Sequence, residues 1–536
     1  MGIPSYFSYI VRNHSEIIKR FTVAAFINGV QNLYLDCNSI IYDSVYNIDF
    51  SMLNESASRA IISRVILKIE EYIDTIKPQH TVIIAFDGVA PVAKLEQQRN
   101  RRYKSWYQSE MTKSIYKNKK SDTWNTAAIT PGTVFMSDLN TLIRKHFTTT
   151  KKYKNEFIVS TSDEHGEGEH KIFQYIRDHK DKHSTETTVI YGLDADLIML
   201  SINHLPICSN IYLFRETPEF IKSIDSSLEP NSTYFLDIPV LAQTIIDDMN
   251  NGNKNETDAD QYRVYDYIFL CFFLGNDFMP HFPAVNIRTG GVDKMINAYK
   301  ATIGGTNANL TDGKTIYWKN VRKMVDFLAN QEEDMLKAEY KLRDRREKQH
   351  YPTDTPEQKY AKFDAIPNYE RELEKYINPY KHHWKERYYN TLLKMDYDDE
   401  RIKQICINYM QALEWTMKYY TTGCADWRWY YQHNYPPLLC DLIRFMPYFD
   451  TEFVKQQKEM PVSPLVQLCY VLPRNSLQML PSKLATLLQT EYSEWYPTDA
   501  EFIWAFCKYF WESHVELPEI EIGDLETLVH KTVTAH

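Results

Sequence analysis

Glycine is scarce in this chain, with 16 residues among 536, and proline contributes only 23. These counts exclude collagen-like and low-complexity proteins. Long apolar runs are also missing. The most apolar stretch, residues 268–274, is far shorter than the roughly 20 residues that a membrane-spanning helix needs. We therefore expect no membrane segment.

Cysteine is sparse too, and its eight residues form no Cys-X-X-Cys pair. This spacing argues against a zinc ribbon and against a thioredoxin-like redox motif. The first residues lack the charged and apolar regions of a secretory signal. We expect free thiols in a reducing, intracellular compartment, with a cytoplasmic location preferred and a nuclear one left open.

Positive charge is not in excess. The chain has 61 Lys and Arg against 71 Asp and Glu, a net charge of −10. This balance excludes a general polycation that coats nucleic acid. It leaves room for a local basic groove, and for a carboxylate-rich metal site that would itself make the chain acidic.

The first 300 residues alternate strand and helix patterns, which predicts a parallel α/β sheet. The predicted strands are 32–36, 81–86, 156–160, 188–192 and 210–214. The predicted helices are 57–77, 92–116, 133–147, 167–179, 236–250 and 262–274. In such sheets, ligands bind beyond the carboxyl ends of the strands.

The remaining chain reads as helical. We place the α/β core at 1–303. A polar break at 304–313 follows, and it marks the start of a linker and charged helical arm at 304–374. Within the arm, residues 331–350 show almost no apolar face and predict a solvated helix. Residues 375–536 form the predicted second, mainly α-helical region.

Several carboxylates fall at predicted strand ends. Asp36 and Asp87 each close a strand, and Asp194 and Asp196 close another. Because a strand places residues i and i+2 on one face, we expect Asp194 and Asp196 to converge. A single aspartate of this kind is more often a turn or helix-capping residue.

Further carboxylates add to this group. Glu167 and Glu169 each follow a glycine near the start of a predicted helix, and Asp277 follows an apolar helix. Like charges in one cleft repel each other, and divalent cations relieve that repulsion. Oxygen-only ligands suit Mg²⁺, with Mn²⁺ as an alternative. Two such ions can hold the attacking and leaving oxygens of a phosphodiester.

A basic helix follows Asp87. Lys94, Gln98, Arg101 and Arg102 are spaced i, i+4, i+7 and i+8, so they share one helical face. Arginine offers paired donors and lysine a point charge, and both bind phosphate. A solvated surface helix is the alternative interpretation.

These residues belong to longer motifs that follow one another in a characteristic order. They are Met1 to Phe7, Asp36 to Ile41, Ala85 to Pro91, Gln97 to Arg102, Ile129 to Thr133, Gly166 to Lys171, Tyr191 to Ile198 and Phe273 to His281. A second series comprises Trp384 to Tyr389, Trp415 to Tyr420, Trp427 to Tyr431 and Val471 to Pro473. In this order the chain resembles the XRN family of 5′→3′ exoribonucleases over about 1–303 and 375–518.

The resemblance implies a PIN/flap-nuclease-like core, walled by a helical second region. It implies a two-metal site, for Mg²⁺ or Mn²⁺, at Asp36, Asp87, Glu167, Glu169, Asp194, Asp196 and Asp277. It also implies a 5′-phosphate pocket made of Lys94, Gln98, Arg101 and Arg102, and base stacking by Tyr42 and Trp427. Tyr42 stands where the family usually has histidine, Val92 where it has arginine and His165 where it has proline.

The implied activity is Mg²⁺-dependent, processive 5′→3′ hydrolysis of single-stranded RNA with a 5′ monophosphate, releasing nucleoside 5′-monophosphates. Two alternatives remain open here: a structure-specific 5′ nuclease acting on DNA flaps, and a non-catalytic sensor or scaffold for RNA 5′ ends. The resemblance adds the decapping machinery as a candidate partner, and we expect a monomer. The Asn-, Ile-, Lys- and Tyr-rich composition is compatible with a viral source, for which a virion or viral factory is a further location.

Overall fold

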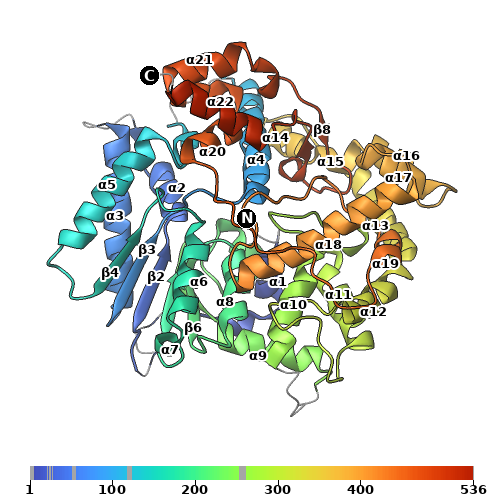
Figure 1. Cartoon of the computed structure of the whole chain (residues 1–536), viewed down its shortest axis with the longest axis horizontal. Helices are drawn as coiled ribbons and strands as arrows, with labels where there is room; N and C mark the ends of the chain where they lie inside the picture. Colours follow the sequence, from blue (N-terminus) through green and yellow to red (C-terminus); the bar gives the residue numbers. More distant parts are fainter. Residues whose placement is uncertain are drawn as a thin grey trace.

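The computed structural model describes residues 5–20, 22, 26, 28–50, 56–117, 124–252 and 261–534. Figure 1 shows a strand-containing half, in blue and green, beside a helical half in yellow and orange. The last helices, in red, lie over both halves. The mixed α/β architecture with a helical second region is therefore as expected.

Within the described residues, a seven-stranded sheet has the order β1-β7-β6-β5-β2-β3-β4. The five strands from β6 to β4 in this order are mutually parallel, whereas β7 pairs antiparallel with both β6 and β1. The strands are β1 (Ile18–Arg20), β2 (Asn32–Asp36), β3 (Thr81–Ala85), β4 (Glu156–Ser160), β5 (Thr188–Tyr191), β6 (Ile211–Glu216) and β7 (Thr233–Asp237). The predicted parallel strands are confirmed, and β1 and β7 were not predicted.

Helices cover both faces of the sheet, which explains the nearly continuous apolar strands. Leu33 and Leu35 face one core, which they share with α3 (Ala57–Ile76) and α5 (Val134–Thr149). Tyr34, between them, faces the opposite core. Because successive side chains of a strand point to opposite faces of the sheet, each strand packs into both cores. The two cores together hold the carboxyl ends of the strands in place.

Three further helices lie close to that edge of the sheet or lead away from it. They are α6 (Gly168–Asp178), α8 (Asp196–His204) and α10 (Arg263–Phe272). Their apolar side chains belong to the same core as Tyr34, and this core continues into the second region through Trp415 and Tyr419. The α/β and helical halves therefore share one continuous core.

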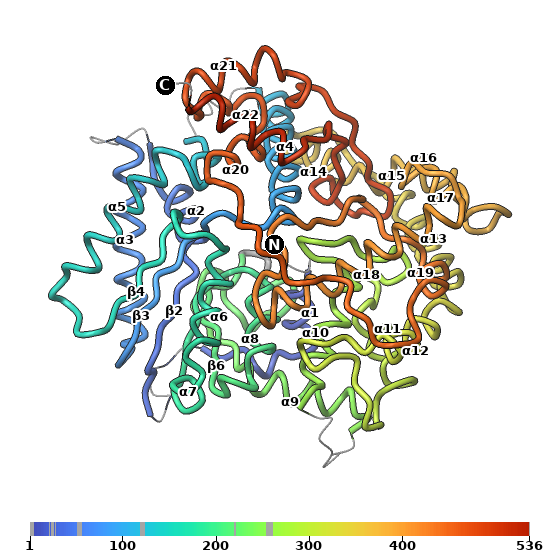
Figure 2. Tube along the Cα trace, viewed as in Figure 1, coloured from blue at the N-terminus to red at the C-terminus, as the bar shows by residue number. Residues whose placement is uncertain are grey.

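Helix α4 (Val92–Tyr116) links the two halves. It starts beyond the carboxyl end of β3 and packs against α14 (Pro356–Asp364) and α20 (Pro464–Val471). Figure 2 shows this blue helix beside the red end of the chain, about 370 residues later in the sequence. The basic face of α4 is thereby carried into the junction between the halves.

Eight of the described helices make up most of the helical half and the end of the chain. Their bounds are α12 (Trp318–Ala329), α13 (Glu332–Glu347), α16 (Glu372–Ile377), α17 (Trp384–Leu392), α18 (Asp399–Thr421), α19 (Leu439–Phe445), α21 (Ser482–Thr490) and α22 (Ile522–Thr534). The domain boundaries after residues 303 and 374 stay predictions.

The expectation of a solvated helix at 331–350 is wrong. Helix α13 buries Leu336, Tyr340 and Arg343. The Arg343 guanidinium donates to Glu374 Oε2 at 2.8 Å, so the buried charge is neutralised. A helix can therefore look polar all round and still be packed, when its charged side chains meet partners of opposite sign.

Two simpler expectations can be compared directly with the structure. All eight cysteines are free. Across the described ranges, no helix combines the length and the apolar character that crossing a bilayer requires.

Candidate active site

The candidate site lies at the carboxyl edge of the parallel strands. Asp36 is the last residue of β2, and Asp87 follows β3 by two residues. A cavity of about 460 Å³ opens there. Its lining includes five of the predicted carboxylates and all four predicted phosphate-binding residues: Asp36, Asp87, Glu167, Glu169, Asp194, Lys94, Gln98, Arg101 and Arg102.

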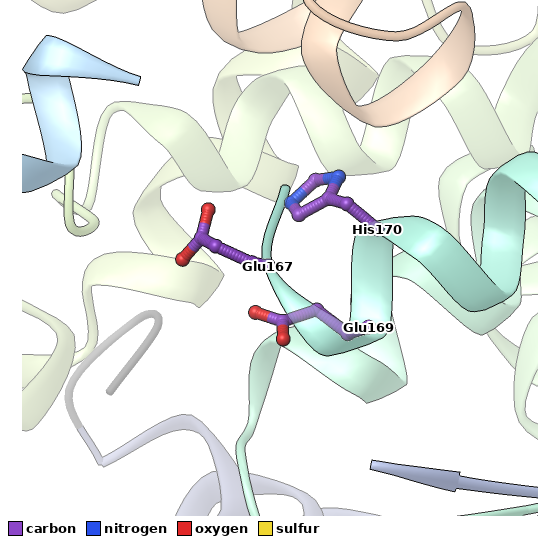
Figure 3. A group of neighbouring side chains, drawn as sticks. All are labelled: Glu167, Glu169 and His170. Atoms are coloured by element: carbon purple, nitrogen blue, oxygen red, sulfur yellow. The ribbon is translucent and has the colours of Figure 1, made fainter. Parts of the chain in front are cut away.

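The start of α6 brings two glutamates into this cavity. Glu167 is the residue before the helix and Glu169 is in its first turn, as the sequence predicted. Figure 3 shows their carboxylates on the same side of the chain, with the His170 ring beside them. One ligand atom from each of these three residues lies within 4.8 Å of the others.

A second cluster joins Glu169 to the strand ends. Oxygens of Asp36, Asp87 and Glu169 also lie within 4.8 Å of one another. The Gly168 amide donates to Asp87 Oδ1 at 2.7 Å. A Cβ at Gly168 would lie 2.7 Å from Asp36 Oδ1, so a larger residue would push the carboxylates apart. A glycine at position 168 is therefore a packing requirement of the site.

The predicted convergence of Asp194 and Asp196 on one strand face is wrong. Strand β5 ends at Tyr191, and Asp196 is already the first residue of α8. Asp194 lies in the connecting loop, lines the cavity and accepts a hydrogen bond from the Asp196 amide at 3.3 Å. The two carboxylates stay close because a tight turn joins strand to helix.

Asp277 meets the basic helix. Lys94 Nζ lies 2.5 Å from Asp277 Oδ2 and 2.8 Å from Glu167 Oε1. Burial alone would lower the pKa of Lys94, but the Asp277 and Glu167 carboxylates raise it well above its usual value. Lys94 thus bridges two carboxylates here, and its role as a phosphate ligand stays a prediction.

Burial, followed by repulsion between like charges, disfavours the charged forms of Asp36, Glu169 and Asp196. Burial, followed by the neighbouring carboxylates, raises the pKa of Asp36 and of Glu169 well above their usual values. Burial together with Asp194 and Asp277 raises the pKa of Asp196 to about 8. Buried carboxylates in contact favour either protonation or a bound cation. Their all-oxygen character suits a hard divalent ion.

The second region contributes a side chain that the sequence did not single out. Tyr419, near the end of α18, donates its hydroxyl to Glu167 Oε2 at 2.7 Å. Its ring stacks on His170 with 3.7 Å between centroids. The motif Trp415 to Tyr420 marked this segment, but a contact between residues 252 apart has no local signature. Tyr419 fixes the orientation of a predicted metal ligand.

We predict that Tyr419→Phe lowers the RNA hydrolysis that the family resemblance implies by about 10- to 100-fold, because a hydrogen bond to a charged group contributes roughly 1.5–3 kcal/mol. The Mg²⁺ concentration that gives half-maximal rate should rise as well. Tyr409→Phe is the matched control, since the Tyr409 hydroxyl donates to the Pro280 carbonyl and not to a carboxylate. Equal Mg²⁺ dependence in both variants would contradict the positioning role.

The basic side of the cavity carries guanidinium groups without carboxylate partners. Neither Arg101 nor Arg102 has an ion pair among the described residues. Arg102 Nη2 donates only to the Ile129 carbonyl, at 3.4 Å, and burial lowers its pKa to about 10. Arg102 remains charged at neutral pH, and neither guanidinium has a carboxylate that would compete with a bound anion.

The two predicted stacking residues lie in different surroundings. Tyr42, on α2 (Asn38–Tyr46), lines the cavity. Trp427 is absent from that lining. Its ring packs edge-on against His165, with centroids 5.2 Å apart, and its carbonyl accepts from the Val92 amide. Stacking by Trp427 therefore stays a prediction.

Added Mg²⁺ should raise the melting temperature of the protein by a few degrees. At a free concentration 100-fold above Kd, binding stabilises the folded state by about 2.7 kcal/mol. A carboxyl with a raised pKa costs stability as pH rises from 3.8 towards that pKa, which is about 8 for Asp196. The Mg²⁺-dependent rise in melting temperature should therefore be larger at pH 8 than at pH 6. Calorimetry with K⁺ at matched ionic strength checks this, and an equal rise with K⁺ would contradict it.

Comparison with known proteins gives two matching family models. Residues 1–217 match the model described as the XRN 5′-3′ exonuclease N-terminus. Residues 257–375 and 357–534 match the Xrn1 helical domain. One solved structure, the catalytic core of Rad2 in complex with DNA substrate, covers 64% of this chain and 80% of its own, at 12% identity and a TM-score of 0.31, which is too low to bear on activity.

Curated relatives match most of the chain. The Drosophila melanogaster 5′-3′ exoribonuclease 2 homolog is 26% identical over 97% of this chain and 70% of its own length. The 5′-3′ exoribonuclease 1 proteins of Saccharomyces cerevisiae and Homo sapiens are 26% and 27% identical over 94% and 97% of this chain, but it spans only 41% and 33% of their lengths. Since the helical-domain model alone covers more than half of the residues, the chain belongs to the XRN family of 5′-3′ exonucleases.

Proposed function

We propose that the protein is a divalent-metal-dependent 5′→3′ exoribonuclease that degrades single-stranded RNA with a 5′ monophosphate to nucleoside 5′-monophosphates. One observation carries the proposal: a single cavity holds both the clustered carboxylates and the unpaired guanidiniums of Arg101 and Arg102. The names of the relatives, 5′-3′ exoribonucleases, support the same activity.

The donor set fits divalent ions. Asp36, Asp87 and Glu169 would hold one, and the carboxylates around Asp194 would complete a second position. Bound Mg²⁺ or Mn²⁺ would supply charge stabilisation for the scissile phosphate and lower the pKa of a water. We prefer Mg²⁺, because the ligands are oxygens.

The remaining steps belong to the side chains of this chain. Arg101 and Arg102 bind the terminal phosphate, while Lys94 and Tyr419 hold Glu167 in a fixed orientation. Hydrolysis adds water across the first internucleotide linkage. The 3′ oxygen of the first nucleotide leaves, and the phosphate stays on the next one. The shortened strand again carries a 5′ monophosphate, so the same pocket can bind it, which supports processive degradation.

The two alternatives are less well supported. The second region contributes to the wall of the cavity, since Gln467 lines it and accepts from the Ala90 amide at 3.0 Å. A walled cavity suits an unpaired strand end better than a DNA flap beside a duplex. A non-catalytic sensor would not need seven carboxylates, and all seven are present.

The test uses RNA and DNA labelled at the 5′ or the 3′ end, incubated with and without Mg²⁺, with products sized over time. We expect the 5′ label to appear at once as a mononucleotide from RNA, and EDTA to abolish the reaction. Release of the 3′ label first, a preference for DNA flaps, or comparable cleavage of circular RNA would contradict the proposal.

The cellular setting is inferred from the same chemistry. Removal of a cap leaves a 5′ monophosphate, so a decapping reaction would supply the proposed substrate. We infer a monomer that acts after decapping in the cytoplasm. Gel filtration and fractionation of the source cells test these two inferences.

A further inference from the structure

Arg215 is a buried cation of the cavity that the sequence did not single out. It is the last but one residue of β6, is 7% exposed and lines the cavity. Its Nε donates to the Glu216 carbonyl at 3.4 Å, and its guanidinium carbon lies over the Phe7 ring, 3.7 Å from the centroid. The Glu216 carboxylate is turned away, towards Tyr72 and Tyr191.

Arg215 lacks the carboxylate partner that two other buried cations, Lys94 and Arg343, have. Lys94 forms ion pairs with Glu167 and Asp277, and Arg343 pairs with Glu374. Among the described residues, no carboxylate oxygen lies within 4.0 Å of the Arg215 guanidinium. Asp194 and Glu216 attract the guanidinium but form no ion pair with it, and a buried charge without an ion pair is costly. The geometry therefore points to an anion that is not part of the protein.

The order of the strands places Arg215 opposite the basic helix. Along the sheet, β6 is followed by β5, β2 and β3. Asp194 follows β5, Asp36 ends β2, and α4 with Arg101 begins beyond β3. The strand spacing puts β6 about 14 Å from β3. The carboxylates thus lie between two separate cationic positions.

We propose that Arg215 binds the phosphate on the 3′ side of the scissile phosphate. This inference rests on the proposed function. The cavity would then hold three consecutive phosphates of one strand: the terminal phosphate at Arg101 and Arg102, the scissile phosphate at the carboxylates, and the next phosphate at Arg215. Stacking on Phe7 fixes the plane of the guanidinium and leaves its N–H edge free for two phosphate oxygens.

Substrate length tests the proposal directly. A 5′-phosphorylated dinucleotide has a terminal and a scissile phosphate but no following one, whereas a trinucleotide has all three. We expect Arg215→Gln to lower kcat/KM for the trinucleotide by about 10- to 100-fold. The kcat/KM for the dinucleotide should change little, because the dinucleotide has no phosphate at this position. Arg215→Lys should restore part of the loss. Arg101→Ala, by contrast, should slow both substrates equally.

In a second experiment, the main comparison uses the wild-type protein alone and changes the substrate. A neutral methylphosphonate replaces the second internucleotide linkage of a longer 5′-phosphorylated RNA, and release of the first nucleotide is measured. The wild-type protein should slow by about 10- to 100-fold, and Arg215→Gln should show no additional loss. Equal slowing of dinucleotide and trinucleotide by Arg215→Gln, or no effect of the neutral linkage, would overturn the site. Absence of RNA hydrolysis by the wild-type protein would instead overturn the proposed function.

Discussion

Glu169→Gln should lower RNA hydrolysis by about 10³-fold or more while leaving the fold intact. Glu169 belongs to both carboxylate clusters, one with Asp36 and Asp87 and the other with Glu167. Glutamine keeps the size of the side chain but removes its charge, so it weakens both clusters, including the one with Asp36 and Asp87 that would hold a divalent ion. Metal ions contribute several kcal/mol to stabilising the transition state, and each 1.36 kcal/mol is a factor of ten in rate.

The measurement is the rate of nucleotide release at saturating Mg²⁺, together with the Mg²⁺-dependent rise in melting temperature. Both should be lost in Glu169→Gln. Glu164→Gln is the matched control, because Glu164 is exposed and contacts Arg144 and Ser160 rather than the clusters. A variant that kept most of the Mg²⁺-dependent activity would show that the clusters are not the metal site.

Without metal, Glu169→Gln should also be slightly more stable than the wild-type protein. Burial and like charges raise the pKa of Glu169 well above its usual value. A neutral amide removes part of this repulsion. Higher stability in EDTA combined with lost activity would separate an electrostatic role from damage to the fold, since damage would lower both.

Strand ends were predictable from the sequence because apolar runs and single acidic residues are local signals. Asp36 and Asp87 lie where the pattern placed them, and Glu167 and Glu169 begin a helix as expected. The error at Asp194 and Asp196 came from the same source. The apolar character continues through Gly192 and Leu193, so periodicity alone could not show that β5 ends at Tyr191.

Contacts between distant segments left no such signal. Tyr419 reaches Glu167 across 252 residues, and it does so only because α18 packs against the start of α6. Arg215 fell just after the predicted strand 210–214, and no motif singled it out. The proposed role of Arg215 depends on the neighbouring strand ends and on the Phe7 ring that stacks against it.

Charge partners explain why Arg343 and Lys94 differ from their predicted roles. Arg343 reads as a solvated residue in a charged helix, but Glu374 neutralises it in the interior. Lys94 reads as a phosphate ligand of a basic face, yet it lies against Asp277 and Glu167. In both cases the sequence shows the charge, and only the fold shows which opposite charge it meets.

Combined Arg101→Ala and Arg102→Ala should abolish the preference for a 5′ monophosphate over a 5′ hydroxyl. A monophosphate supplies up to two charges and three acceptor oxygens to these guanidiniums, whereas a hydroxyl end leaves them unpaired. Removing one partner of a desolvated charge pair costs roughly 2–5 kcal/mol, which is about 30-fold to several thousand-fold. The loss should fall on monophosphorylated RNA and hardly affect the slow reaction of hydroxyl-ended RNA.

The same cavity should select against larger ends. Gln467 of the second region lines one side of it, and we expect a cavity of about 460 Å³ to exclude the bulk that a triphosphate or a cap adds beyond the terminal phosphate. The measurement compares kcat/KM for RNA with monophosphate, hydroxyl, triphosphate and capped ends. Lys113→Ala is the control, since Lys113 is an exposed cation on the same helix and pairs with Glu110. Equal degradation of all four ends by the wild-type protein would contradict the pocket, because it would mean that Arg101 and Arg102 do not meet the terminal phosphate.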